Sequence, residues 1–164
     1  MKKRIYSVLV ENQAGVLCKV AGLFSRRCFN IDSLAVGETD SPEVSCMTIV
    51  SSGDERTIEQ IEKQLNKKLD VIKVKTLKEQ QCITKELMLV KIKYNANNRK
   101  EIMEICEIMN AQIVDMSKHF MIIQICDAPD RVKGLLAMFR SISIVEVART
   151  GTLALSKCSE SDKG

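Results

Sequence analysis

The sequence predicts an α+β protein built from two βαββαβ units of the ferredoxin-like type. Strand and helix patterns follow one another in the order strand, helix, strand, strand, helix, strand, and this order occurs twice. The first strands of the two copies start near residues 4 and 86, which are 86 − 4 = 82 residues apart. The copies share their order but little sequence, so we predict a structural repeat.

In the first copy, a strand leads into a helix over residues 15–27, where apolar residues recur at helical spacing. The predicted strands are 4–10, 30–38, 44–51 and 71–75. Asp54 is placed to cap the second helix. The residues expected on the buried face of this second helix are Ile58, Ile61, Leu65 and Leu69.

In the second copy, the predicted helices are residues 99–109 and a segment that begins at Pro129, a residue that the first helical turn accepts. The predicted strands are 86–93, 111–117, 119–126 and 144–149. We therefore expect an N-terminal domain over 1–76, a linker over 77–85, a C-terminal domain over 86–156 and a flexible tail over 157–164. One sheet face in each domain would need cover, from another domain or another chain.

Composition narrows the class of protein. The chain has 164 residues with a net charge of +4, and positive and negative side chains share the same segments, unlike a nucleic-acid-binding arm. The sequence has no run of apolar residues long enough for a membrane span and no signal peptide, so we expect a cytoplasmic protein without a membrane partner. The seven cysteines are odd in number and lack a C-x-x-C pair, which predicts buried, reduced thiols.

Catalytic and metal-binding patterns are missing from the sequence. His119 is the only histidine, and the common nucleotide, zinc-protease and hydrolase motifs are absent. We expect no catalytic residues, no metal and no cofactor in this chain.

The turn between the first strand and the first helix is the best candidate for a binding site. Residues 12–17 read Asn-Gln-Ala-Gly-Val-Leu, so Gly15 stands where the helix starts. The unpaired N–H groups of a helix start suit the carboxylate of a small ligand. A tight turn at Gly15 and a helix exit at Asn30 would explain the same residues without a ligand.

With this turn in a βαββαβ unit, the chain resembles the ACT family of amino-acid-sensing regulatory domains. More specifically, it resembles the small regulatory subunits of acetolactate synthase (acetohydroxyacid synthase) over about residues 2–156. The segments that carry the resemblance are 4–12, 12–17, 29–36, 47–50, 61–65, 86–92 and 145–151. Two positions depart from the family pattern, because Cys28 stands where glycine is common and Cys46 where a basic residue is common.

The resemblance implies a non-catalytic subunit in branched-chain amino-acid biosynthesis. Such a subunit binds and activates a larger catalytic subunit, which carries thiamine diphosphate, Mg and FAD, and confers feedback inhibition by valine. It forms a homodimer through its ACT domains, with the effector between two chains. The residues that would bind the effector are Asn12, Gln13, Ala14, Gly15, Val16 and Leu17 of one chain, with Asn30 and Ile31 of the other.

The choice among valine, leucine and isoleucine stays open, because it depends on the packing of the pocket. Two other functions also remain open. One is a stand-alone ACT-type sensor that acts on another target. The other is an RNA-binding module, which would need aromatic side chains on the central strands. Phe120 is the only aromatic residue in the strands predicted at 44–51 and 119–126, so the RNA-binding hypothesis has little support.

Overall fold

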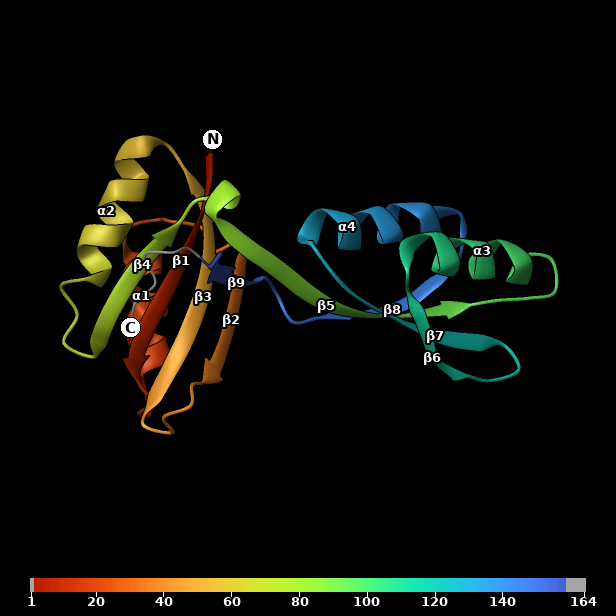
Figure 1. The fold of residues 1–164 in the computed structure, drawn as a ribbon, viewed down its shortest axis with the longest axis horizontal. Helices are drawn as coiled ribbons and strands as arrows, with labels where there is room; N and C mark the ends of the chain where they lie inside the picture. The colour runs from red at the N-terminus through yellow and green to blue at the C-terminus, as the bar shows by residue number, and fades with distance from the viewer. Residues whose placement is uncertain (1, 159–164) are drawn as a thin grey trace. The chain divides into compact units, whose positions relative to one another are not determined.

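The computed structural model describes residues 2–158 and divides the chain into two compact units. Of the described residues, unit 1 contains 2–83 together with 152–158, and unit 2 is Thr84–Gly151. Each unit has an antiparallel sheet with two helices (Figure 1). The predicted α+β class with two βαββαβ units is confirmed.

Unit 1 has a four-stranded sheet in the order β2-β3-β1-β4, with α1 and α2 on one of its faces (Figure 1). Its elements are β1 (Lys2–Glu11), α1 (Val16–Arg26), β2 (Ser33–Glu38), β3 (Val44–Gly53), α2 (Glu55–Leu65) and β4 (Val71–Leu77). Strand β2 lies at one edge of the sheet and pairs only with β3 within unit 1. In β1, Tyr6, Val8 and Val10 face the helices and belong to the main core. Burial raises the pKa of Tyr6 to about 12, so its hydroxyl stays protonated and donates to the carbonyl of Ile58 at 3.4 Å.

The opposite face of this sheet is covered in part by a strand that the sequence analysis missed. Strand β9 (Leu153–Ser156) places Ala154 against four buried residues. These residues are Ile5, Val50, Leu77 and Cys82. Ile5 lies opposite both Val50 and Leu77 in the sheet, so the cluster occupies three neighbouring strands. Part of the cover that we expected from another domain or chain therefore comes from this chain itself.

The segment predicted as a linker, residues 77–85, is regular structure. Leu77 ends β4, a 3-10 helix (η1) covers Glu79–Gln81, and β5 begins at Cys82. The N–H of Lys157 donates to the carbonyl of Gln81 at 3.0 Å, so the tail predicted from residue 157 begins with an ordered residue. The rest of that predicted tail, residues 159–164, lies outside the described residues. The sequence suggested a linker here because this segment is polar. In the structure, buried and exposed positions alternate along this part of β5.

The prediction that Leu69 lies on the buried face of α2 is wrong. The helix is capped by Asp54, as predicted, through a hydrogen bond of 2.7 Å from the N–H of Thr57. It ends at Leu65, which is fully buried, whereas Leu69 is 98% exposed. Helical spacing stops predicting burial once the helix has ended.

Unit 2 has the sheet order β6-β7-β5-β8, with α3 and α4 on one face (Figure 1). Its elements are β5 (Cys82–Lys93), α3 (Arg99–Met109), β6 (Gln112–Met116), β7 (Phe120–Asp127), α4 (Pro129–Met138), η2 (Phe139–Ser141) and β8 (Ile144–Arg149). Strand β5 crosses the boundary between the units and also pairs with β9. Inside unit 2, Glu86 of β5 forms a two-pronged ion pair with Arg149 of β8, at 2.6 and 3.0 Å.

None of the seven cysteines forms a disulfide within residues 2–158. Only Cys82 and Cys106 are buried, so the prediction of buried thiols holds for two positions. Burial raises the pKa of the Cys106 thiol. Four others are exposed, on a helix, on a strand and in segments outside both.

Candidate functional site

The turn at Gly15 has the conformation that its sequence predicts. Gly15 adopts φ 87° and ψ −10°, which is left-handed backbone, and it is the N-cap of α1. The N–H of Val16 reaches the carbonyl of Gln13 at 3.3 Å, so the four residues form a turn with glycine at its third position. Glycine is suited to this position because a side chain at positive φ is strained.

The start of α1 is electrostatically open to an anion. The first N–H groups of a helix lack partners inside it and carry the positive end of the helix dipole. Gly15 has no side chain to cap them, and the first turn of α1 contains no acidic residue. The first turns of α2, α3 and α4 contain Glu55, Glu101 and Asp130. Of the four α-helices in the described chain, α1 thus offers the least opposition to a bound carboxylate.

Asn12 holds the end of β1 against the loop that connects β2 to β3. Its side-chain Nδ2 donates to the carbonyl of Pro42 at 2.8 Å and to Oε1 of Glu38 at 3.2 Å. Its backbone N–H donates to the carbonyl of Glu43 at 2.7 Å. Glu38 is the last residue of β2, so the turn lies beside the C-terminal end of that strand.

Asn30 lies near the other end of β2, in a polar cluster that the sequence analysis did not identify. Its Nδ2 donates to Oδ1 of Asp32 at 2.6 Å, and the hydroxyl of Ser52 donates to Oδ2 of Asp32. The hydroxyl of Ser51 donates to the backbone carbonyl of Asn30 at 2.6 Å. The Asn30-x-Asp32 spacing was the only signal in the sequence, because Ser51 and Ser52 come from a distant strand.

Cys28 takes the conformation that glycine would normally fill at the end of α1. Its φ is 55°, and its N–H donates to the carbonyl of Ser25 while the N–H of Phe29 donates to that of Phe24. This pair of bonds is the Schellman ending of a helix. The strained residue stands two positions before Asn30 and fixes where the chain leaves the helix.

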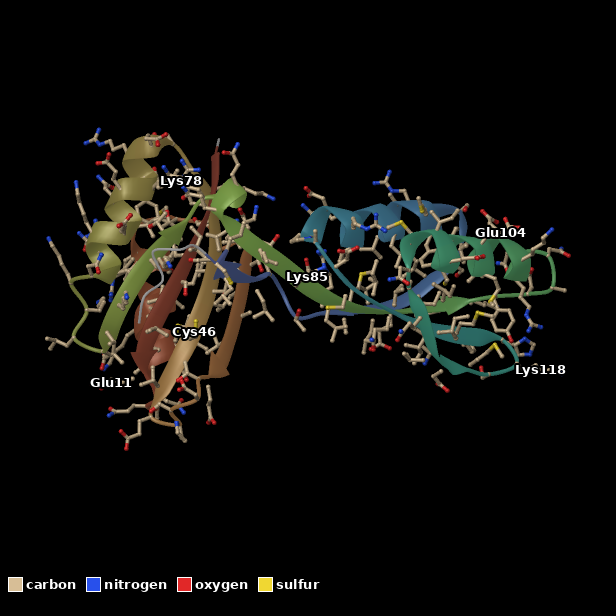
Figure 2. All side chains as sticks on the ribbon, in the orientation of Figure 1. Glu11, Cys46, Lys78, Lys85, Glu104 and Lys118 are labelled. Carbon is tan, nitrogen blue, oxygen red and sulfur yellow. The ribbon has the colours of Figure 1, made fainter. Side chains whose placement is uncertain are left out.

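Cys46, the second departure from the family pattern, lies on β3 and is labelled in Figure 2. Its sulfur is 3.6 Å from the hydroxyl of Ser7, and the side chain is partly buried. The thiol thus contacts the neighbouring strand β1 and does not supply the basic group that is common at this position in the family.

The apolar residues predicted for the site separate into two groups. Val16 is 2% exposed and belongs to the core, so it holds the helix in place and cannot receive a ligand. Leu17 is 43% exposed. Ile31 is partly buried beside the core. Gln13 and Ala14 are exposed in the turn.

The two walls of the predicted site lie at opposite ends of unit 1. Helix α1 has 11 residues, so its ends are about 16 Å apart. Strand β3 gives a second measure. Glu11 pairs with Val44, whereas the N–H of Asp32 donates to the carbonyl of Val50, six residues further and roughly 20 Å away. Glu11 marks the turn end of the sheet in Figure 2, and Lys78 marks the other end. One chain alone cannot place a small ligand against both walls.

Two surface hollows lie elsewhere in the described chain. One surface hollow in unit 1 runs along β4, η1 and the end of β9, and one in unit 2 lies on β5, β7 and β8. Within residues 2–158, no group of three or more His, Cys, Asp and Glu side chains could hold a metal ion. No helix of this part of the chain has both the length and the apolar character needed to cross a bilayer.

Comparison with known proteins identifies the family. Residues 6–73 match the model of the AHAS small subunit-like ACT domain, and residues 85–158 match that of the small subunit of acetolactate synthase. The chain is 44% identical over 156 residues to the acetolactate synthase isozyme 3 small subunit of Salmonella typhimurium, covering 94% of this chain and 96% of that protein. It is 44% identical over 153 residues to the probable acetolactate synthase small subunit of Archaeoglobus fulgidus, with coverage of 93% and 96%.

A solved structure supports the same conclusion. The acetolactate synthase small subunit of Thermotoga maritima matches with a TM-score of 0.90 and 36% identity, over 97% of this chain and 99% of that one. The agreement covers both units, and the turn at Gly15 falls inside the matched ACT domain. The resemblance predicted from the sequence is confirmed, and the chain belongs to the family of acetolactate synthase small subunits.

Proposed function

We propose that this chain is the regulatory subunit of an acetolactate synthase, and that it binds L-valine between two copies of its first unit. It has no catalytic residues of its own, and it activates the larger catalytic subunit and makes that subunit sensitive to feedback inhibition. Thiamine diphosphate, Mg and FAD belong to the catalytic subunit, and the complex works in the cytoplasm. Family membership supports the subunit role.

The separation of the two walls carries the proposal of a dimer. Glu38, at one end of β2, contacts Asn12 of the turn, and Asn30 precedes the other end of β2 by three residues. Among the described residues of unit 1, no strand pairs with the outer edge of β2. If two β2 edges pair antiparallel about a two-fold axis, the start of one strand lies beside the end of the other. The turn of one chain then meets Asn30 of its partner copy, which gives two equivalent sites.

The chemistry at each wall suits an α-amino acid with a branched apolar side chain. The N–H groups at the start of α1 bind the carboxylate, and Gly15 lets the ligand approach the backbone closely. Leu17 and Ile31 are accessible and apolar, so they can receive an isopropyl group. One methylene changes the binding free energy in such a pocket by ~1–3 kcal/mol, so leucine and isoleucine are the competitors to compare.

Regulation follows from linkage between the site and the arrangement of the two chains. Valine bridges the copies and stabilises one arrangement of the regulatory dimer, whereas the active catalytic subunit binds the other. A difference of ~1–3 kcal/mol in the affinity of valine for the two arrangements is enough for useful control.

The test is a calorimetric titration of the full chain with L-valine, L-leucine and L-isoleucine, using wild type, Gly15→Asp and Gly15→Ala. We expect one valine per chain for wild type and no detectable binding for Gly15→Asp. A second carboxylate about 4 Å from that of the ligand costs roughly 4 kcal/mol at an effective dielectric constant of about 20. Gly15→Ala has the same backbone strain without the charge, and no atom lies within 4 Å of its added methyl group. It should therefore still bind, more weakly.

Circular dichroism and the melting temperature show whether both variants remain folded. Absence of binding by wild type with all three amino acids would contradict an effector site in the chain alone. Co-purification with the thiamine-diphosphate-dependent subunit, and an increase in its activity, separates the regulatory subunit from a stand-alone sensor.

A further inference from the structure

The polar cluster around Asp32 determines which way the side chain of Asn30 faces. Oδ1 of Asp32 accepts from Nδ2 of Asn30 at 2.6 Å, and Oδ2 accepts from the hydroxyl of Ser52. The backbone N–H of Asp32 donates to the carbonyl of Val50 at 2.8 Å. Asp32 is thus bonded to β3 through its backbone N–H and through Oδ2 of its carboxylate. The other carboxylate oxygen, Oδ1, faces Asn30.

An ionised carboxylate can only accept hydrogen bonds. The amide of Asn30 must therefore turn its NH₂ group toward Asp32, and its carbonyl oxygen Oδ1 points away from that carboxylate. The side chain of Asn30 is exposed, so this oxygen is accessible. Asp32 thus fixes the orientation of this amide, with Nδ2 on the side of the carboxylate and the carbonyl oxygen on the accessible side.

The same logic applies to Asn12 at the other wall. Its Nδ2 is used by the carbonyl of Pro42 and by Glu38, and both of these partners can only accept. Its carbonyl oxygen is left for other contacts. Both side-chain donors of Asn12 and one of the two of Asn30 are therefore bound within the protein, and neither carbonyl oxygen is used by these bonds.

We propose that Asn12 and Asn30 bind the ammonium group of the effector through their carbonyl oxygens, and that Asp32 is the residue that positions Asn30 for this role. The inference rests on the proposed function. An asparagine side chain in general suits either the ammonium or the carboxylate of such a ligand, and these hydrogen bonds select the ammonium. The site then has acceptors and donors in separate places. The amide oxygens bind the ammonium, and the N–H groups of α1 bind the carboxylate. The ligand class is a free α-amino acid, and the equivalent carboxylic acid without its amino group is rejected.

The test compares L-valine with 3-methylbutanoate, which has the same carboxylate and isopropyl group but no ammonium. Both are titrated calorimetrically into the full chain as wild type, Asp32→Ala, Asp32→Asn and Asp40→Ala. For wild type we expect valine to bind at least ~10-fold more tightly than 3-methylbutanoate, which corresponds to one good hydrogen-bonded contact. In Asp32→Ala the affinity for valine falls ~10-fold and that for 3-methylbutanoate does not change, so only the part of the preference that Asn12 supplies remains.

Asp32→Asn distinguishes positioning from charge. An asparagine at this position can still accept from Nδ2 of Asn30, so most of the preference for valine is retained. Asp40→Ala removes an exposed carboxylate of the same charge from the loop after β2 and should leave both affinities unchanged. Melting temperatures report on folding, but only the ratio of the two affinities reports on the orientation of Asn30.

The outcomes separate this inference from the function on which it rests. Failure of wild type to bind valine would overturn the proposed effector site, and this inference with it. Binding of valine by wild type, with the same preference in Asp32→Ala, would overturn the positioning role and leave the effector site standing. Loss of the preference in Asp32→Asn to the extent seen in Asp32→Ala would show that the charge of Asp32 acts directly.

Discussion

The two units share one fold and differ at the start of their first helix. In unit 1, α1 follows a glycine turn and has no acidic residue in its first turn. In unit 2, α3 follows a loop in which Oδ1 of Asn95 accepts from the N–H groups of Asn97 and Asn98, and Glu101 lies in the first turn. An anion would meet open N–H groups in unit 1 and a carboxylate in unit 2. The same architecture therefore leaves the first turn without an acidic residue in one copy and places a carboxylate there in the other.

The units also differ in what covers the sheet face opposite the helices. Strand β9 covers part of the open face in unit 1, where Ile5, Val50, Leu77 and Cys82 are buried. The open face of unit 2 keeps a shallow hollow, lined by Leu89, Lys91, Ile122, Glu146 and Ala148. Unit 2 in turn has an ion pair whose acidic side chain is only 4% exposed, which no described ion pair of unit 1 matches. These differences predict which substitutions affect each unit.

The largest expected effect comes from breaking the buried ion pair of unit 2. Arg149→Met leaves the carboxylate of Glu86 buried without its partner, and we expect the free energy of unfolding to fall by about 3 kcal/mol. Urea denaturation of the full chain measures the loss, and hydrogen exchange should locate it in β5 and β8. The control is Arg131→Met, whose ion pair with Asp127 is more exposed and should contribute less than ~1 kcal/mol. Equal losses from the two variants would contradict the special role of Glu86.

The second effect tests the cover that β9 provides. Ala154→Asp puts a carboxylate against the apolar cluster of unit 1, and we expect a loss of about 2 kcal/mol in the stability of that unit. Ala148→Asp makes the same chemical change on the open face of unit 2 and should change stability by less than ~0.5 kcal/mol. Thermal melting followed by hydrogen exchange compares the two. If both variants were neutral, β9 would contribute nothing to unit 1.

The third effect compares the ends of the first helices. Cys28 in unit 1 and Asn110 in unit 2 both have positive φ, at 55° and 53°. Asparagine tolerates this conformation better than cysteine, so Cys28→Gly should stabilise the chain by about 1 kcal/mol and Asn110→Gly by no more than a few tenths. Chemical denaturation of both variants checks the order. A larger gain from Asn110→Gly would show that Cys28 carries little strain.

The smallest effect is a matched dependence on pH in the two units. Hydrogen bonds from Thr57 hold the pKa of Asp54 below its usual range in unit 1, and the N–H of Ala128 with the ammonium of Lys85 does the same for Asp127 in unit 2. A lowered pKa in the folded chain stabilises it above the unfolded pKa of about 3.9, and this contribution is lost as the pH falls further. Melting temperatures from pH 6 to pH 2 should therefore fall less steeply in Asp54→Asn and in Asp127→Asn than in wild type. Unchanged slopes would show that neither carboxylate contributes.

The sequence predicted the helices and strands well wherever burial follows a regular spacing. Helix α3 has the predicted bounds, and Pro129 opens α4 as expected. Errors occurred where spacing continued past the end of an element, as at Leu69, or where a strand has only four residues, as in β9. The polar segment at 77–85 also suggested a linker because the sequence alone does not show which strands meet there.

Only the part of the candidate site that is contiguous in the sequence could be predicted. The turn of residues 12–17 is contiguous in the sequence, so its glycine conformation and helix start could be predicted. The orientation of Asn12 and Asn30 could not, because it depends on Glu38, Pro42 and Asp32 and on the pairing of strands. Hydrogen-bond partners brought together by tertiary structure leave no periodic signal in a single sequence.

The position of β9 also determines how late in synthesis the apolar cluster of unit 1 can be covered. Leu77 and Ala154 meet in one cluster, yet 154 − 77 = 77 residues separate them, and unit 2 is synthesised in between. At about 5–20 residues per second, a ribosome takes roughly 4–15 s to cover that distance. During that interval the sheet of unit 1 can form while Ile5, Val50 and Leu77 stay uncovered. A nascent chain thus exposes this apolar cluster for seconds. That is long enough for a chaperone or a neighbouring nascent subunit to bind the cluster before β9 covers it.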